Sequence, residues 1–268
     1  MVRFIQLSDL HIRGSMHRDE NENCGKLVAW ICEHYAADEN KPVVLLTGDI
    51  TDDGKEDQYR NAVALLRPLV DAGFRVLACP GNHDYGPWGN FYTEEGQRRF
   101  QRHIMTELLA YPAADAQGVE MEGLFPTTHV EGDVVFIGLD SVVGREDALA
   151  HFASGEVGEN QRGRLAEILR AHAERRKVVY FHHHPFNRHL VMEMADAHEV
   201  MRLLAGRADV VCFGHNHESD IWSSAHDIDW ILAAGKSNRR NARYKFEFRE
   251  VTFDGENSHV TKLMFKRD

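Results

Sequence analysis

Residues 2–11 read VRFIQLSDLH, an apolar run that ends in an aspartate and a histidine two positions apart. Short apolar runs of this kind, rich in branched side chains, are typical of buried strands. Residues two apart in an extended chain point the same way, so Asp9 and His11 can reach one ion. The stretch therefore predicts a buried strand that brings two metal-binding side chains to its carboxyl end.

The same kind of apolar run recurs along the chain and alternates with helical patterns. Further strand-like runs occur at 42–47, 74–79, 133–139, 177–181 and 209–213. Apolar residues at helical spacing occur at 22–37, 55–72, 159–175 and 196–206. Strands that alternate with helices predict an α/β fold. We expect a four-layer αββα sandwich, in which two mixed β-sheets are flanked by helices.

Two parts of the chain depart from this alternation. The runs at 229–235, 244–253 and 259–265 have no helices between them, so we expect C-terminal strands over about 229–265. The stretch 85–128 is irregular apart from a short helical piece near 94–110, and it is long for a connection. Such a stretch is expected to be a functional insertion or a cap over the site. The sequence contains no linker, so residues 1–268 are predicted to form a single domain.

Polar motifs follow four more of the predicted strands. They are GDITDDG (48–54), PGNHDYG (80–86), HHHP (182–185) and GHNH (214–217). Loops at the carboxyl ends of strands are where α/β proteins build their sites. Nitrogen and oxygen ligands without sulfur suit Mn, Fe, Zn or Co. The ligands are too many for one ion, and two cations are a standard arrangement for hydrolysing phosphate esters, because they generate hydroxide and neutralise the phosphate oxygens.

This ordered set of motifs resembles that of the calcineurin-like metallophosphoesterases. It is most similar to the bacterial branch called class III cyclic nucleotide phosphodiesterases, which includes glycerophosphodiesterases. The resemblance implies a first divalent or trivalent metal ion bound by Asp9, His11, Asp49 and His217. It implies a second bound by Asp49, Asn82, His183 and His215, with Asp49 bridging the two.

The resemblance also implies roles for single residues beside the metals. The family's ligand histidine lies two residues before the proline, which selects His183 over His182 and His184. His83 would contact the phosphate and help to protonate the leaving oxygen. Asp52 would orient His83, since a carboxylate that pairs with an imidazole fixes the ring and raises its basicity. Asp52 could instead cap the helix that begins near residue 55.

Two further segments have two readings each. The family often places an arginine soon after the GNHD motif, but this chain has YGPWGNFY at 85–92. These aromatic residues could stack on a flat group of the substrate or simply pack the insertion. The run KSNRRNAR at 236–243 is locally basic in an acidic chain. It could be a solvated loop or an edge that recognises phosphate.

Composition narrows the partners and the location. The formal net charge is −11, which argues against binding long nucleic acid, because such binding needs many contacts from Lys and Arg to phosphates. No apolar run is long enough to span a membrane, and the start of the sequence does not resemble a signal peptide. We therefore expect a cytoplasmic protein whose partner is a small phosphoester, with homo-oligomers left open.

The predicted function is hydrolysis of a small phosphodiester, either a cyclic nucleotide or a glycerophosphodiester, by metal-activated hydroxide. A phosphomonoesterase that acts on a nucleotide or a sugar phosphate is the main alternative. A nuclease or a pyrophosphatase of the same superfamily would use the same ligands. A noncatalytic scaffold is disfavoured because every expected type of ligand is present.

Overall fold

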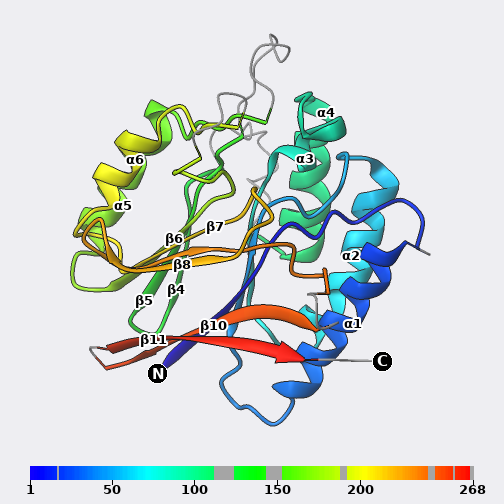
Figure 1. Cartoon of the computed structure of the whole chain (residues 1–268), viewed down its shortest axis with the longest axis horizontal. Coiled ribbons are helices and arrows are strands. Elements are labelled where there is room, and N and C mark those ends of the chain that lie inside the picture. Colours follow the sequence, from blue (N-terminus) through cyan, green and yellow to red (C-terminus); the bar gives the residue numbers. More distant parts are fainter. Residues whose placement is uncertain are drawn as a thin grey trace.

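Two β-sheets pack face to face, with helices on the outer face of each (Figure 1). The computed structural model describes residues 1–16, 18–111, 124–142, 153–187, 192–240, 245–255 and 257–265. Helices α1 (Asp19–His34) and α2 (Glu56–Asp71) lie on one side of the molecule. Helices α5 (Glu159–Ala171) and α6 (Ala197–Leu204) lie on the other. The predicted four-layer sandwich is confirmed.

The first sheet has the strand order β11-β10-β1-β2-β3. Strands β1 (Val2–Leu7), β2 (Val43–Thr47) and β3 (Val76–Cys79) run parallel. Strands β10 (Phe246–Asp254) and β11 (Asn257–Phe265) form a hairpin, and β10 pairs antiparallel with β1. The carboxyl ends of the three parallel strands therefore meet at one edge, where the motifs after residues 7, 47 and 79 begin.

The second sheet has the strand order β4-β5-β6-β7-β9-β8. Its parallel centre consists of β5 (Val134–Gly138), β6 (Arg176–Tyr180), β7 (Val210–Phe213) and β9 (Ile228–Ala233). Antiparallel strands β4 (Thr127–Glu131) and β8 (Asp220–Ala225) close its two edges. The three C-terminal runs are thus divided between the sheets, because β9 joins the second and the β10–β11 hairpin joins the first.

Side chains of the second sheet alternate between two separate apolar clusters. Val134 and Phe136 pack toward the first sheet, where the rings of Phe136 and Phe4 meet edge to face at 5.7 Å. Val135 and Ile137 pack toward the outer helices. Both faces of these strands are buried, which explains why their sequences are continuously apolar. Each fully buried side chain of this size stabilises the fold by about 1.5–3 kcal/mol.

Residues 80–111, in the described part of the chain between β3 and β4, form short helices. They are α3 (Asn82–Tyr85), η1 (Pro87–Gly89), α4 (Glu94–Arg99) and the wider π-type turns of η2 (Phe100–Leu108). Residues 112–123 of the expected insertion lie outside the described residues, so its role as a cap stays a prediction. Strands β4 and β8 were not predicted, since they are mostly exposed and their sequences, TTHVE and DIWSSA, are largely polar. Among the described helices, none has the length and apolar character needed to cross a membrane.

Candidate metal centre

The backbone at the strand ends adopts an unusual conformation. Five of the seven predicted ligands have a positive φ, namely Asp9 (54°), His11 (45°), Asp49 (50°), His215 (77°) and His217 (57°). Residues other than glycine adopt this region at a cost of about 1–3 kcal/mol each, and such residues cluster at functional sites. The loops after β1, β2 and β7 are therefore strained at the positions whose side chains converge.

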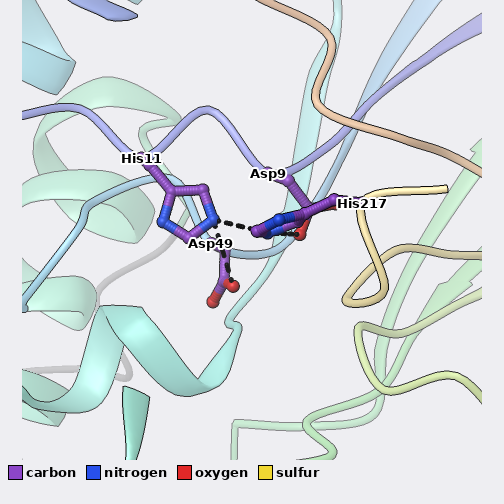
Figure 2. A group of neighbouring side chains, drawn as sticks. All are labelled: Asp9, His11, Asp49 and His217. Atoms are coloured by element: carbon purple, nitrogen blue, oxygen red, sulfur yellow. Dashed lines mark hydrogen bonds and ion pairs between the residues drawn. The ribbon is translucent and has the colours of Figure 1, made fainter. Parts of the chain in front are cut away.

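Four of the predicted ligands form one group (Figure 2). The Nε2 atoms of His11 and His217 lie 2.9 Å apart, and His217 Nε2 lies 3.4 Å from Asp9 Oδ1. His11 Nε2 lies 3.6 Å from Asp49 Oδ2. The second oxygen of Asp9 is buried and has no hydrogen-bond partner among the described residues. A buried carboxylate oxygen beside two facing imidazole nitrogens is an arrangement that a cation would satisfy.

A second group lies on the other side of Asp49. His182 Nε2 is 3.2 Å from Asp49 Oδ2, 3.1 Å from Asn82 Oδ1 and 3.3 Å from His215 Nδ1. Asn82 Oδ1 is 3.2 Å from His215 Nδ1. The structure therefore brings Asn82 and His215 together with Asp49, as the sequence predicts, but the third partner is His182 and not His183.

His183 lies next to this group without joining it. Its Nδ1 atom is 2.9 Å from the hydroxyl of Ser141, and its buried Nε2 atom has no hydrogen-bond partner among the described residues. The adjacent His182 is held by its other nitrogen, since Nδ1 donates to the carbonyl of Thr47 at 2.8 Å. A Cβ on Gly48 would lie 2.4 Å from His182 Nδ1, so only glycine leaves room for this ring.

Asp49 is shared by the two groups. Its Oδ2 atom faces both His11 and His182, while Oδ1 accepts a hydrogen bond from the backbone of His83 at 2.9 Å. Burial by itself raises the pKa of Asp49, but the positive charges of His182 and His83 outweigh burial and hold this pKa well below its usual value. Burial alone lowers the pKa of His182, yet Asp49 and Asp9 raise it to about 9. The carboxylate is therefore ionised and placed to bridge two cations.

The two predicted catalytic residues lie together, but in a different relation from the expected one. The ring of His83 bonds through Nδ1 to the backbone carbonyl of Asp52 at 2.7 Å, not to its carboxylate. The carboxylate of Asp52 instead lies 3.3 Å from His11 Nδ1 and forms an ion pair with Arg13, whose Nη1 atom lies 2.8 Å from Asp52 Oδ2. Asp52 thus orients His83 through its main chain and supports the metal-group residue His11 through its side chain.

A buried carboxylate ties two of the site loops together. Asp84 is fully buried and accepts hydrogen bonds from the backbone of Gly81, Ile50 and Thr51 at 2.9, 3.2 and 2.8 Å. Burial and the nearby charge of Asp49 raise its pKa to about 6. Asp84 therefore fixes the loop with Asn82 and His83 against the loop with Asp49. The GNHD motif contained this residue, but the sequence did not show which backbone groups it would bind.

A sequence model of calcineurin-like phosphoesterases matches residues 2–219. The chain belongs to the calcineurin-like phosphoesterase family. Membership of this family indicates a hydrolase that acts on phosphoesters. The family resemblance predicted from the sequence is therefore confirmed.

Individual relatives of this calcineurin-like phosphoesterase are distant. A 3',5'-cyclic adenosine monophosphate phosphodiesterase, CpdA, from Haemophilus influenzae is 22% identical over 230 residues, which cover 81% of this chain and 70% of the relative. Among solved structures, a dimetal phosphatase from Danio rerio superposes with a TM-score of 0.66 at 14% sequence identity. The match covers 99% of this chain and 98% of the Danio rerio chain. The purple acid phosphatase PPD1 from yellow lupin superposes with a TM-score of 0.60 at 13% sequence identity, and the match covers 97% of this chain and 51% of the lupin chain. At these identities, the structures support the fold alone.

The donor atoms of this calcineurin-like phosphoesterase fit a pair of metal ions. Two atoms that bind the same ion at about 2.0–2.1 Å lie roughly 2.8–3.4 Å apart when the angle between them lies between the octahedral and the tetrahedral value. The contacts of His182 with Asp49, Asn82 and His215 span 3.1–3.3 Å and lie within this range. In the other group, the contacts of His217 with His11 and Asp9, at 2.9 and 3.4 Å, also lie within it, and the 3.6 Å separation of His11 and Asp49 is slightly longer. The family uses a dinuclear centre, and the clustered aspartates and histidines match it.

Proposed function

We propose that this chain is a dinuclear metal-dependent phosphodiesterase that hydrolyses a small diester, either a cyclic nucleotide or a glycerophosphodiester. The observation that carries the proposal is the carboxylate of Asp49, which faces a ligand group on each side. The cyclic-nucleotide phosphodiesterase activity in the name of the relative from Haemophilus influenzae supports the choice of a diester. Mn, Fe, Zn or Co would suit the nitrogen and oxygen donors.

In this proposal one group would consist of Asp9, His11, Asp49 and His217, and the other of Asp49, Asn82, His182 and His215. The bound cations would supply an activated water and neutralise the phosphate oxygens. The hydrogen bond between Asn82 Nδ2 and the carbonyl of Gly89, at 2.9 Å, turns the amide oxygen of Asn82 toward His182 and His215. The segment after the GNHD motif thus helps to orient a ligand.

His83 is the proposed acid for the leaving oxygen. Its Nδ1 atom donates to the carbonyl of Asp52, which fixes the ring and leaves Nε2 to face the substrate. In the imidazolium form Nε2 donates a proton to the oxygen that departs from phosphorus. A Cβ on Gly89 would lie 2.6 Å from this Nε2 atom, so the backbone of η1 borders the position where the leaving group would sit.

Trp88 is the proposed contact for a flat leaving group such as a nucleobase. Its side chain is 71% exposed, and its backbone has a φ of 58°, held by a hydrogen bond from its N–H to the carboxylate of Asp53 at 3.1 Å. The ring meets Phe91 edge to face at 5.8 Å. Trp88 is a large apolar residue that is held exposed next to Gly89, which borders His83. This position favours stacking of Trp88 on the substrate over simple packing within the insertion.

Hydrolysis of bis-p-nitrophenyl phosphate by the purified protein tests the proposal, with Mn, Fe, Zn and Co added in turn. We expect turnover with at least one metal, and we expect Asn82→Ala and His215→Ala to abolish it. Rates on p-nitrophenyl phosphate separate a monoesterase from a diesterase. Cyclic nucleotides, glycerophosphodiesters and nucleoside monophosphates then distinguish natural substrate classes. Lack of turnover with every metal would refute the proposal.

A further inference from the structure

Residues 236–240, the described part of the basic run, are fixed against the metal centre. The backbone of Ser237 donates to the carbonyl of Ser8 at 3.1 Å, and the hydroxyl of Ser237 accepts from the backbone of Ser8 at 2.9 Å. The side-chain amide of Asn238 donates to the carbonyl of Leu10 at 2.5 Å. Ser237 and Asn238 are both buried, and Ser8 and Leu10 flank the metal-group residue Asp9. Residues 236–240, the described part of this segment, are therefore anchored to the wall of the site.

The charged neighbours of these anchors border a cavity that opens beside His217. The cavity has a volume of about 280 Å³, and its lining includes His217, Ser219, Lys236, Arg239, Arg240 and Glu247. On its other side His217 contacts His11 and Asp9 within the first ligand group. The cavity thus adjoins the metal centre through a shared wall. Its volume is just below the roughly 300–1,000 Å³ of sites that hold a whole drug-sized ligand, which suits one group of a larger substrate.

The charge of this cavity is positive in a chain whose formal net charge is −11. The one carboxylate among the described lining residues, Glu247, already pairs with Lys262 at 2.7 Å. Within the described part of the chain, the half-buried ammonium of Lys236 has no direct hydrogen bond or ion pair. Burial lowers the pKa of Lys236, and the charges of Glu20 and Asp9 oppose that change. A cation that is half removed from water without a direct partner is suited to bind an anion.

We propose that this cavity, called here the cationic pocket, binds a second anionic group of the substrate while the reacting phosphoester lies at the metal centre. The inference rests on the proposed phosphodiesterase function and narrows its substrate class to diesters that carry an additional phosphate or carboxylate. Lys236 and Arg239 bind this group by charge-assisted hydrogen bonds. They are specificity-determining residues that contact a part of the substrate distant from the bond that breaks.

Kinetics on matched substrates test the cationic pocket. The p-nitrophenyl ester of thymidine 5'-phosphate is compared with derivatives that carry a 3'-phosphate or a 3'-succinyl carboxylate. We expect the 3'-anion to raise kcat/KM about tenfold or more, because each ionic hydrogen bond contributes at least that factor. The derivative with the larger increase identifies the anion. The double variant Lys236→Met, Arg239→Met should lose the increase. The control Arg98→Met, Arg207→Met, which removes two cations exposed elsewhere, should keep it.

Acetylation of lysines in the metal-loaded protein gives a readout that needs no turnover. Inorganic phosphate should slow the acetylation of Lys236 several-fold relative to that of Lys55, and Arg239→Met should weaken this protection. Turnover without a 3'-anion effect and without protection would overturn the cationic pocket and leave the proposed function standing. Protection without turnover of any diester would refute the proposed function and leave an anion site. Loss of the anion effect in the control variant as well would also overturn the inference.

Discussion

Replacement of His182 or His183, one at a time, distinguishes which of these adjacent histidines binds metal. Both side chains are fully buried at the end of the same strand, so His182→Asn and His183→Asn remove rings of equal size from equally buried positions. Their stability costs should therefore be similar. Their contacts differ, because His182 Nε2 faces Asp49, whereas His183 bonds Ser141.

The expected magnitude follows from those contacts. His182→Asn removes one of the four side chains of the second group. The Nε2 atom of His182 lies 3.1–3.3 Å from the donor atoms of the other three, Asp49, Asn82 and His215. Loss of a residue that only supports a ligand costs about 10–100-fold in metal affinity, so loss of a ligand should cost more than about 100-fold. A loss of more than about 100-fold in affinity corresponds to a loss of more than about 2.7 kcal/mol of binding free energy. His183→Asn and Ser141→Ala should each lower metal affinity by only about 10–100-fold.

Metal content after gel filtration, measured by elemental analysis, provides the assay, together with turnover as a function of added Mn. We expect about one equivalent of metal to be lost from His182→Asn and both equivalents to be kept by His183→Asn. Thermal unfolding of both variants controls for misfolding. The opposite result, in which His183→Asn loses a metal and His182→Asn keeps two, would refute the assignment.

Three further perturbations test separate parts of the structure. Asp52→Asn should weaken metal binding about 10–100-fold, with activity restored by excess metal, because its carboxylate supports His11; a fall in kcat at saturating metal would instead support the predicted side-chain role beside His83. Trp88→Ala should lower kcat/KM for a cyclic nucleotide relative to a glycerophosphodiester by about 5–150-fold, the equivalent of about 1–3 kcal/mol of stacking; equal losses on both substrates would exclude stacking. Burial raises the pKa of Asp140 from 3.8 to about 7, so the folded protein retains a proton that the unfolded chain releases, and stability falls as the pH rises through this interval. Asp140→Asn can keep the hydrogen bond that Asp140 accepts from the backbone of Val142. In urea unfolding, the free energy of unfolding of this variant should rise by about 2–3 kcal/mol relative to that of wild type between about pH 5 and pH 8. A difference that stays constant over this pH range would contradict the explanation by a buried acid.

Much of the fold could be predicted because the local patterns agree with the tertiary structure. Runs such as VRFIQL and DVVFIGL became β1 and β5, and the helical spacing at 55–72 became α2. Strand β8 was missed because its side chains are mostly exposed, so its sequence lacks the apolar signal on which the prediction depends. The C-terminal strands were found, but their division between two sheets depends on contacts distant in sequence.

The sequence by itself determined which residue types reach the site, because each ligand follows a buried strand and parallel strands end at one edge. Only the tertiary structure decided which histidine of HHHP enters it. Val178 and Tyr180 of β6 face the other sheet, and His182 continues that face toward Asp49, while Val179 and Phe181 face the helices. Both faces of this strand are buried and apolar, so alternation in the sequence could not show which face lay between the sheets. The packing of one sheet on the other made that choice.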